Sequence, residues 1–287
     1  MVSLHAMYKY NVPAQIAAGE EIPLGEIARR CSVENDDALG RLLQHAVTNR
    51  LLAQPRPGHI AHSAISAMLA GSPPLMDWVG SSCEDIWPAA PRVVEALTRW
   101  PGQDQALPIH TGHNLAEGTS VSYFETMARR PERAKRFASA MSIMQTMPGW
   151  EPSAALNAYD WGALEKGATI VDVGGSNGAF AALLTERYPS LSVAVQDQPD
   201  VIKTAALPAH AMDKVTLQAH DFFEPQPVEG ADVYFLRMIL HDWPDHLAMK
   251  ILRQLIPALK PGARIIINDH CIPPPGSTSR REEWQSR

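Results

Sequence analysis

The feature that most constrains the fold is a glycine-rich turn between a short β-branched run and a helical pattern. Residues 169–173 form the run, Gly174, Gly175 and Gly178 follow, and apolar residues recur at helical spacing from Phe180. Glycine permits a tight turn and lets a ligand approach the backbone without interference from a Cβ atom. The pattern predicts a strand, a ligand-binding turn and a helix, the opening unit of a Rossmann-like α/β domain.

Further apolar runs alternate with helical segments toward the C-terminus. They lie at residues 191–195, 215–223, 231–240 and 263–268, which with the first run makes five predicted strands. Such alternation is typical of βαβ units, so a mostly parallel sheet is expected. Before about residue 150, apolar residues recur mainly at helical spacing, which predicts a separate helical part with a boundary near residues 150–153.

The glycine turn is compatible in geometry with NAD, FAD or S-adenosylmethionine. A pyrophosphate loop reads Gly-x-Gly-x-x-Gly, whereas here Asp172 precedes two adjacent glycines. A nearby carboxylate disfavours a pyrophosphate and suits the cationic groups of a sulfonium amino acid, so S-adenosylmethionine is the expected cofactor. Asp197, 19 residues after Gly178 at the end of the second run, can accept hydrogen bonds from both ribose hydroxyls.

Two interpretations stay open for the end of the third run. Asp221 can accept a hydrogen bond from an adenine amino group while Phe222 covers the ring. Alternatively, Asp221 caps a turn, and Phe222 and Phe223 belong to the core.

Residues 22–69 predict a helix–turn–helix with a wing. Two helical patterns flank a turn at residues 32–37, and a hairpin is expected around residues 55–58. Such a unit can read DNA. However, residues 20–56 contain five Arg against six Asp and Glu, which leaves no positive field for phosphates. A packing or dimerisation role is expected instead.

Composition excludes several classes of protein. The net charge of −6 argues against nucleic-acid and anionic-membrane partners. Cys31, Cys83 and Cys271 are too few and too scattered for a disulfide framework or a thiolate metal site, and no ligand spacing indicates a metal. No stretch approaches 18 apolar residues, and the N-terminus lacks a signal-peptide profile, so a cytoplasmic protein is expected.

Together the motifs resemble those of small-molecule S-adenosylmethionine-dependent O-methyltransferases of the plant caffeate/flavonoid and fungal secondary-metabolite types. The resemblance spans nearly the whole chain and is carried by residues 171–178, 196–199, 220–223 and 240–245. It implies a class I methyltransferase fold preceded by a winged-helix domain, and a homodimer. The implied domains are a dimerisation domain at 1–105, a helical linker and substrate-facing region at 106–150, and a cofactor-binding catalytic domain at 151–287.

The resemblance also implies residue roles. His241 would be the general base, and Asp269 matches the acidic position that steadies it. The cofactor would be bound by Asp172, Gly174, Gly175, Gly178, Asp197, Asp221, Phe222 and Arg237, and the acceptor by Asn114, Phe137, Met141 and Asp242.

The chemistry of the residues is compatible with these roles. Methyl transfer to oxygen is an in-line displacement that depends on orientation. A phenol, with a pKa of about 10, needs a base near neutral pH, and histidine ordinarily titrates at about 6.5. The expected acceptor is therefore a hydroxyl of a small aromatic or polyketide-like metabolite.

The sequence departs from the family pattern at its C-terminal end. The family sheet has seven strands, whereas five are predicted here, and the pocket-lining segment with a second catalytic glutamate is missing after residue 276. The domain is therefore expected to be shortened. Two alternatives stay open beside methyl transfer: an O-methyltransferase-like cyclase or pericyclase that uses the same pocket for acid–base ring formation, and a non-catalytic dimerising partner.

Overall fold

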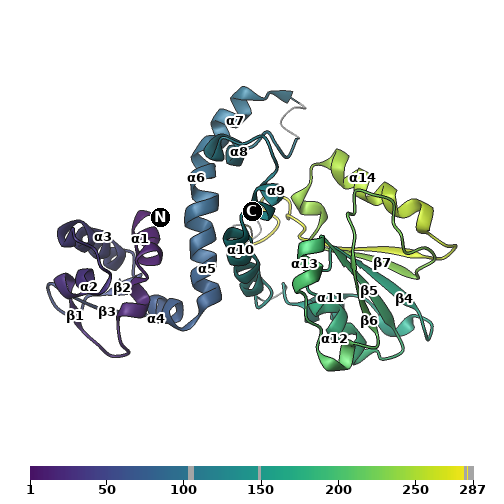
Figure 1. Ribbon diagram of the computed structural model, residues 1–287, viewed down its shortest axis with the longest axis horizontal. Coiled ribbons are helices and arrows are strands. Elements are labelled where there is room, and N and C mark those ends of the chain that lie inside the picture. Colours follow the sequence, from purple (N-terminus) through teal and green to yellow (C-terminus); the bar gives the residue numbers. More distant parts are fainter. Residues whose placement is uncertain (103–106, 148–149, 281–282, 284–287) are drawn as a thin grey trace. The chain divides into compact units, whose positions relative to one another are not determined.

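The computed structural model describes residues 1–102, 107–147, 150–280 and 283. The chain forms two compact units, Met1–Pro148 and Gly149–Arg287, which Figure 1 shows in colours that follow the sequence. Within the described residues, no helix is both long and apolar enough to cross a membrane. The finer division of the first unit near residue 105 stays a prediction.

The first unit is mainly helical. Its α-helices are α1 (Val2–Lys9), α2 (Leu24–Arg30), α3 (Asp36–Thr48), α4 (Ala64–Gly71), α5 (Pro73–Ser81), α6 (Trp87–Ala89), α7 (Val93–Arg99), α8 (Gly112–Glu117), α9 (Tyr123–Ala128) and α10 (Pro131–Met144). Its strands are β1 (Ile22–Pro23), β2 (Leu52–Ala53) and β3 (His59–His62), which pair antiparallel in the order β1-β3-β2.

The predicted helix–turn–helix and hairpin are present in this unit. Asn35 caps α3 by accepting a hydrogen bond from the backbone N–H of Ala38. Leu39 and Leu43, four residues apart on α3, are buried against the apolar residues of α1, α2 and the hairpin. The strands β2 and β3 enclose the predicted turn. The amphipathic spacing therefore located these elements correctly.

A buried ion cluster connects three helical segments of the first unit. A π-helical turn at Ser82–Ile86 follows α5 and presents Glu84 and Asp85. Arg136 of α10 binds both carboxylates, and its guanidinium also donates to the Tyr8 hydroxyl of α1 at 3.1 Å. Since a π-turn shifts the helical register, it turns two successive acids toward the same arginine.

The second unit is a parallel sheet with helices on both faces. Its strands are β4 (Thr169–Val173), β5 (Ser192–Asp197), β6 (Val215–Ala219), β7 (Val233–Arg237) and β8 (Arg264–Asn268), and its α-helices are α11 (Pro152–Ala158), α12 (Ala179–Arg187), α13 (Pro199–Thr204) and α14 (Asp245–Leu255). The strand order is β6-β5-β4-β7-β8, and every pairing is parallel.

All five strand predictions are confirmed, and two of the strands are shorter than expected by several residues. The fourth strand, predicted over residues 231–240, ends at Arg237 because Met238 takes a positive φ of 56°, which extended backbone cannot have. A short 3₁₀ turn at Leu240–Asp242 follows. The third run, predicted to residue 223, is a strand only to Ala219.

Alternate residues of the central strands enter two separate cores. Ile170 and Phe235 face a cluster that includes apolar residues of α11 and α12. Val171 and Tyr234 face the other cluster, which includes Ile251 of α14. Figure 1 shows α14 on one face of the sheet and α11 and α12 on the other. Because helices bury both faces of the sheet, the sequences of its strands are nearly continuous apolar runs.

The strand order reverses at β4, because the chain moves outward to β5 and β6 and then returns to the other side of β4 as β7. In open α/β sheets a ligand crevice forms outside the carboxyl ends of the strands at such a reversal. The fold therefore predicts that a ligand binds where β4, β5 and β7 end.

Trp161 is the largest fully buried side chain among the described residues of the second unit, and its removal should destabilise this unit. Its ring centroid lies 4.8 Å from Tyr159, 5.6 Å from Phe180 and 5.4 Å from Phe235. Trp161→Ala should lower the free energy of unfolding by about 3–5 kcal/mol, as measured by urea denaturation. Met212→Ala, at an exposed position, should change it by less than about 0.5 kcal/mol. Equal losses in both variants would contradict this account of the core.

Candidate functional site

The loop between β4 and α12 is tightly packed around its glycines, most clearly at two positions. Gly174 has φ of +72°, and a Cβ atom there would lie 2.4 Å from Cδ1 of Ile239. A Cβ atom on Gly175 would lie 2.5 Å from Oδ2 of Asp172. Both distances are shorter than van der Waals contact, so the close turn inferred from the sequence is present.

Asp197 holds the glycine loop against the end of β5. Its Oδ2 accepts a hydrogen bond from the backbone N–H of Ser176 at 2.8 Å, and its Oδ1 accepts one from Gln198 at 2.7 Å. Burial raises the pKa of this carboxyl group, and the two N–H donors oppose that rise. Each carboxylate oxygen keeps a lone pair, so Asp197 can still accept from a ligand's hydroxyl groups.

Asp172 is a buried acid at the carboxyl end of β4. Only 2% of the residue is exposed, and among the described residues its Oδ2 has no hydrogen-bond partner. Burial raises its pKa to about 7, while the charge of Arg237 lowers it and that of Asp197 raises it. Arg237 ends β7 and donates to the backbone carbonyl of Trp150. Burial lowers the pKa of the Arg237 guanidinium, and Asp172 opposes that shift.

The structure shows the turn cap and the core packing of the second interpretation of Asp221 and Phe222, and the first interpretation stays open. Asp221 is exposed and caps a turn, since its Oδ1 accepts from the backbone N–H of Phe223 at 2.9 Å. Phe222 packs at the edge of the second core, with its ring centroid 5.8 Å from that of Trp243. It is also close to the loop, because a Cβ atom on Gly174 would lie 3.9 Å from its Cε1. Contact with adenine stays a prediction.

His241 and Asp269 meet after two neighbouring strands. Nδ1 of His241 lies 2.5 Å from Oδ1 of Asp269, and its backbone N–H donates to Oδ2 at 3.1 Å. Asp269 also accepts from the backbone N–H of His270 at 2.9 Å. Because β7 and β8 pair in parallel, their ends place the 3₁₀ turn beside residue 269. The carboxylate is thereby anchored, and it fixes the imidazole in one orientation.

Asp242 flanks the other side of the imidazole. Its Oδ1 lies 3.4 Å from Nε2 of His241. Burial raises the pKa of Asp242, whereas the charge of His241 lowers it and that of Asp269 raises it. The histidine therefore lies between two carboxyl groups, and the Nδ1 contact is the shorter of the two.

The expected acceptor-binding residues Asn114, Phe137 and Met141 belong to the first unit. Asn114 is buried, its Oδ1 accepts from the Thr111 backbone, and its Nδ2 donates to backbone carbonyls of residues 119 and 121. These bonds make it part of the cap of α8. Phe137 and Met141 lie on α10, and Phe137 packs edge-on against Tyr123 with ring centroids 5.8 Å apart. A contact of these three residues with an acceptor stays a prediction.

Sequence reasoning missed Glu151, which influences the guanidinium of Arg237 electrostatically. No spacing rule connects residue 151 with residue 237, because the pair forms only when the chain before α11 reaches the end of β7. The one available signal was a carboxylate close to the start of the α/β unit.

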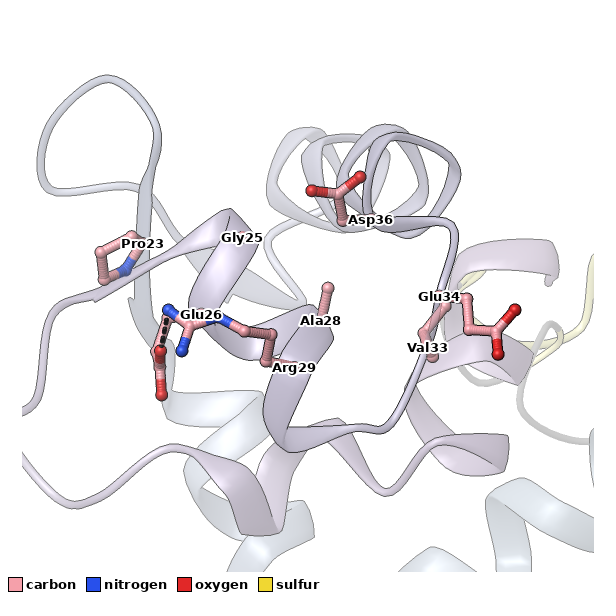
Figure 2. Close-up of a pocket in the computed structure, with 8 residues that line it drawn as sticks. All are labelled: Pro23, Gly25, Glu26, Ala28, Arg29, Val33, Glu34 and Asp36. Carbon is pink, nitrogen blue, oxygen red and sulfur yellow. Dashed lines mark ion pairs between the residues drawn. The ribbon is translucent and has the colours of Figure 1, made fainter.

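Two features of the described residues argue against a competing site. The first unit has an open hollow of about 560 Å³ between α2 and α3, lined in part by Glu26, Arg29, Glu34 and Asp36 (Figure 2). Glu26 and Arg29 are paired with each other there, and Figure 2 shows the carboxyl groups of Glu34 and Asp36 well apart. Over the described residues, no group of three or more His, Cys, Asp or Glu is placed to hold a metal ion.

The buried acid at the end of β4 should make stability depend on pH. A carboxyl group whose pKa is higher in the folded state binds its proton more tightly there, so folding loses stability as pH rises from about 4 to about 7. Asp172→Asn cannot lose a proton. Relative to this variant, the wild type should become less stable over that interval by a few kcal/mol. Urea denaturation of both proteins at a series of pH values measures the difference, and parallel curves would contradict it.

Comparison with known proteins identifies the family of the chain. A family model for the O-methyltransferase domain matches residues 104–286. The chain is 40% identical to the chlorophenol O-methyltransferase of Trichoderma longibrachiatum, over 98% of this chain and 61% of the relative. It is 39% identical to the grayanic acid biosynthesis cluster O-methyltransferase of Cladonia grayi, over 99% of this chain and 60% of the relative. The chain thus spans about three fifths of the length of these two relatives.

Solved structures show the same fold. The complex of LepI with S-adenosylmethionine superposes with a TM-score of 0.77 at 27% identity, over 99% of this chain and 73% of that one. The mitomycin 7-O-methyltransferase MmcR has a TM-score of 0.77 at 24% identity, over 95% and 76%. The predicted Rossmann-like fold is therefore confirmed, and the chain belongs to the O-methyltransferase domain family.

Proposed function

We propose that this chain catalyses S-adenosylmethionine-dependent methyl transfer to a hydroxyl group of a small aromatic or polyketide-like metabolite. The observation that carries the proposal is the pairing of His241 with Asp269. These two residues follow β7 and β8, and β7 is the neighbour of β4, the strand that the glycine loop follows. The chlorophenol O-methyltransferase named above supports a phenolic acceptor, and the relative from a grayanic acid biosynthesis cluster supports a small metabolite as the acceptor.

The residues of the glycine loop fit the proposed cofactor. Asp197 has acceptor capacity for two ribose hydroxyls, and Gly174 and Gly175 allow the loop to turn closely against the end of the sheet where Asp197 lies. Asp172 and Arg237 supply buried charges close by. The complex of LepI with S-adenosylmethionine supports the same choice. When bound, the cofactor supplies a methyl group on a positively charged sulfur.

The residues around His241 can move the proton that the reaction releases. Nδ1–H donates to Asp269, so the lone pair of Nε2 is available to take the proton of the acceptor hydroxyl as the new O–CH₃ bond forms. Asp242, 3.4 Å from Nε2, stabilises the imidazolium until the proton passes to water. General-base assistance of this kind contributes roughly 10²–10⁴-fold to the rate.

The first unit contributes the proposed self-association. Its α7 and the preceding π-turn expose aliphatic side chains, among them Ile86, Val93 and Val94. Contiguous patches of exposed apolar residues are typical of interaction surfaces. A homodimer therefore stays part of the proposal. A reducing compartment is proposed as well, since the three cysteines are free.

A cyclase or pericyclase is the second candidate. The structure described as a pericyclic reaction enzyme superposes with a TM-score of 0.75 at 26% identity, over 99% of this chain and 73% of that one. A protein of this fold can therefore catalyse a reaction other than methyl transfer. In this chain, His241 and Asp269 would then act as acid and base in ring formation.

An assay of the reaction products separates the two candidates. Incubation of the purified chain with methyl-labelled S-adenosylmethionine and a panel of phenols should transfer label to an acceptor and release S-adenosylhomocysteine in equal amount. Mass spectrometry detects both products. Conversion of an acceptor to an isomer of unchanged mass, without S-adenosylhomocysteine, would instead support the cyclase.

Replacement of the proposed base tests its role. His241→Ala should lower kcat by roughly 10²–10⁴-fold and leave the cofactor Kd nearly unchanged, because the imidazole acts on the acceptor. His246→Ala, at an exposed position on α14, is the matched control and should keep wild-type activity. If His241→Ala weakens cofactor binding as much as it slows turnover, the assignment of the base is wrong. Kinetics and calorimetry supply the two readouts.

A further inference from the structure

Three glutamine side chains form a hydrogen-bonded network inside the second unit. Gln196 is the penultimate residue of β5, Gln218 is the penultimate residue of β6, and Gln226 lies between β6 and β7. Only 1% of Gln196 and 5% of Gln226 is exposed. We call these three residues the glutamine network.

The network occupies a position where an apolar core would be expected. Gln196 pairs in register with Val173 of β4, and Val173 belongs to the core on the α14 side of the sheet. A buried amide is tolerated only when its hydrogen bonds are made, whereas an apolar side chain of similar size needs none. Amides at this place therefore indicate a requirement for direction, which apolar contacts do not supply.

The hydrogen bonds of the network are short and partly reciprocal. Nε2 of Gln196 donates to Oε1 of Gln226 at 2.8 Å and to Oε1 of Gln218 at 2.9 Å. Nε2 of Gln226 donates back to Oε1 of Gln196 at 2.8 Å. Gln196 thus uses both of its side-chain N–H groups within the network, and its amide is held in one orientation.

A single backbone N–H group fixes the direction of these bonds. The N–H of Val228 donates to Oε1 of Gln226 at 2.9 Å, and an N–H group can only donate. The oxygen of Gln226 is thereby fixed, and the amide orientations of Gln196 and Gln218 follow from it. The backbone N–H of Gln226 also donates to the carbonyl of Gln254 on α14 at 3.1 Å. The network therefore fastens the end of β5 to α14.

The glycine loop is bonded to the same end of β5. The backbone carbonyl of Gln196 accepts from the N–H of Gly175 at 3.0 Å. The next residue, Asp197, accepts from the N–H of Ser176 with its carboxylate and from the N–H of His220 with its backbone carbonyl. A displacement of the Gln196 side chain would therefore shift both the loop and Asp197.

We propose that Gln196, Gln218 and Gln226 are positioning residues for the nucleoside half of the cofactor, an inference that rests on the proposed function. They act from the α14 side of the sheet and fix the end of β5. Through the backbone of β5 they set the place of the glycine loop and of the Asp197 carboxylate, which the ribose needs.

Loss of the reciprocal bonds tests the proposal by calorimetry on the full chain. Gln226→Met keeps the length of the side chain and removes both bonds to Gln196. The Kd of S-adenosylmethionine should rise by roughly tenfold, and that of 5′-methylthioadenosine by the same factor, because only the nucleoside half depends on the network. Ile251→Val, in the core on the same face, is the matched control for lost packing and should leave both Kd values within about twofold.

A conservative variant should restore the affinity. A protonated glutamic acid at position 226 can accept from Val228 and Gln196 with its carbonyl oxygen and donate to Gln196 with its O–H group. Because burial favours the neutral carboxyl group, Gln226→Glu at pH 5 should bind both ligands within about twofold of the wild type at that pH, whereas Gln226→Met stays weak. Gln54→Glu, at an exposed position, is the matched control and should bind as the wild type does.

Hydrogen exchange without ligand gives a readout besides binding. In Gln226→Met, peptides that contain Gly175 and Ser176 should exchange roughly tenfold faster than in the wild type, while peptides of β8 keep their protection. Gln218→Met, at a half-buried position, removes one bond and should raise both Kd values by about threefold. This milder variant keeps the test decisive if Gln226→Met does not fold.

Several outcomes would overturn the proposal. If Ile251→Val loses as much affinity as Gln226→Met, or if exchange quickens equally in β8, the network only supports the fold. If Gln226→Glu at pH 5 is as weak as Gln226→Met, hydrogen bonding is not the cause. Wild-type affinity in both methionine variants would exclude any role in positioning. A wild-type chain that binds neither ligand would instead contradict the proposed function, a result distinct from the others.

Discussion

Strand β4 hydrogen-bonds in parallel to β5 on one side and to β7 on the other, and the positions of the candidate groups follow from those two pairings. The pairing with β5 brings Asp197 over the glycine loop, where it accepts from the backbone of Ser176. The pairing with β7 brings Arg237 to Asp172. A slip of one residue in either register would turn these side chains to the opposite face of the sheet.

Burial of charge is the physical cost of this arrangement. Asp172 and Asp197 both have pKa values raised by burial, and Arg237 has one lowered by it. A core that only needed stability would contain apolar residues here, because a buried ion pair seldom repays its desolvation. The same low polarity strengthens interactions with a charged ligand, which gives these positions a reason to stay polar.

Sequence reasoning found the groups that lie within strand-to-loop motifs. Gly174, Gly175, Asp197 and the segment around His241 follow predicted strands, so their location at one edge of the sheet could be inferred from chain order and the parallel rule. It assigned Asn114 to acceptor binding, whereas the structure uses this side chain to cap α8, and its role toward an acceptor stays a prediction. Capping bonds depend on local backbone geometry that a motif comparison does not include.

The sequence by itself determined the division of the chain into a helical part and an α/β part, the five strands and the glycine turn. Periodicity and glycine placement are local properties, because they reflect backbone conformation and alternate burial within a few residues. Tertiary structure alone decided that Glu151 acts on Arg237 and that Asp172 is left with a buried oxygen without a partner in the described chain. It also decided that Asp269, which the resemblance implied beside His241, meets its Nδ1 atom. These contacts join residues 28 to 86 positions apart, and their distances depend on how strands pair and helices pack, which no short window of sequence contains.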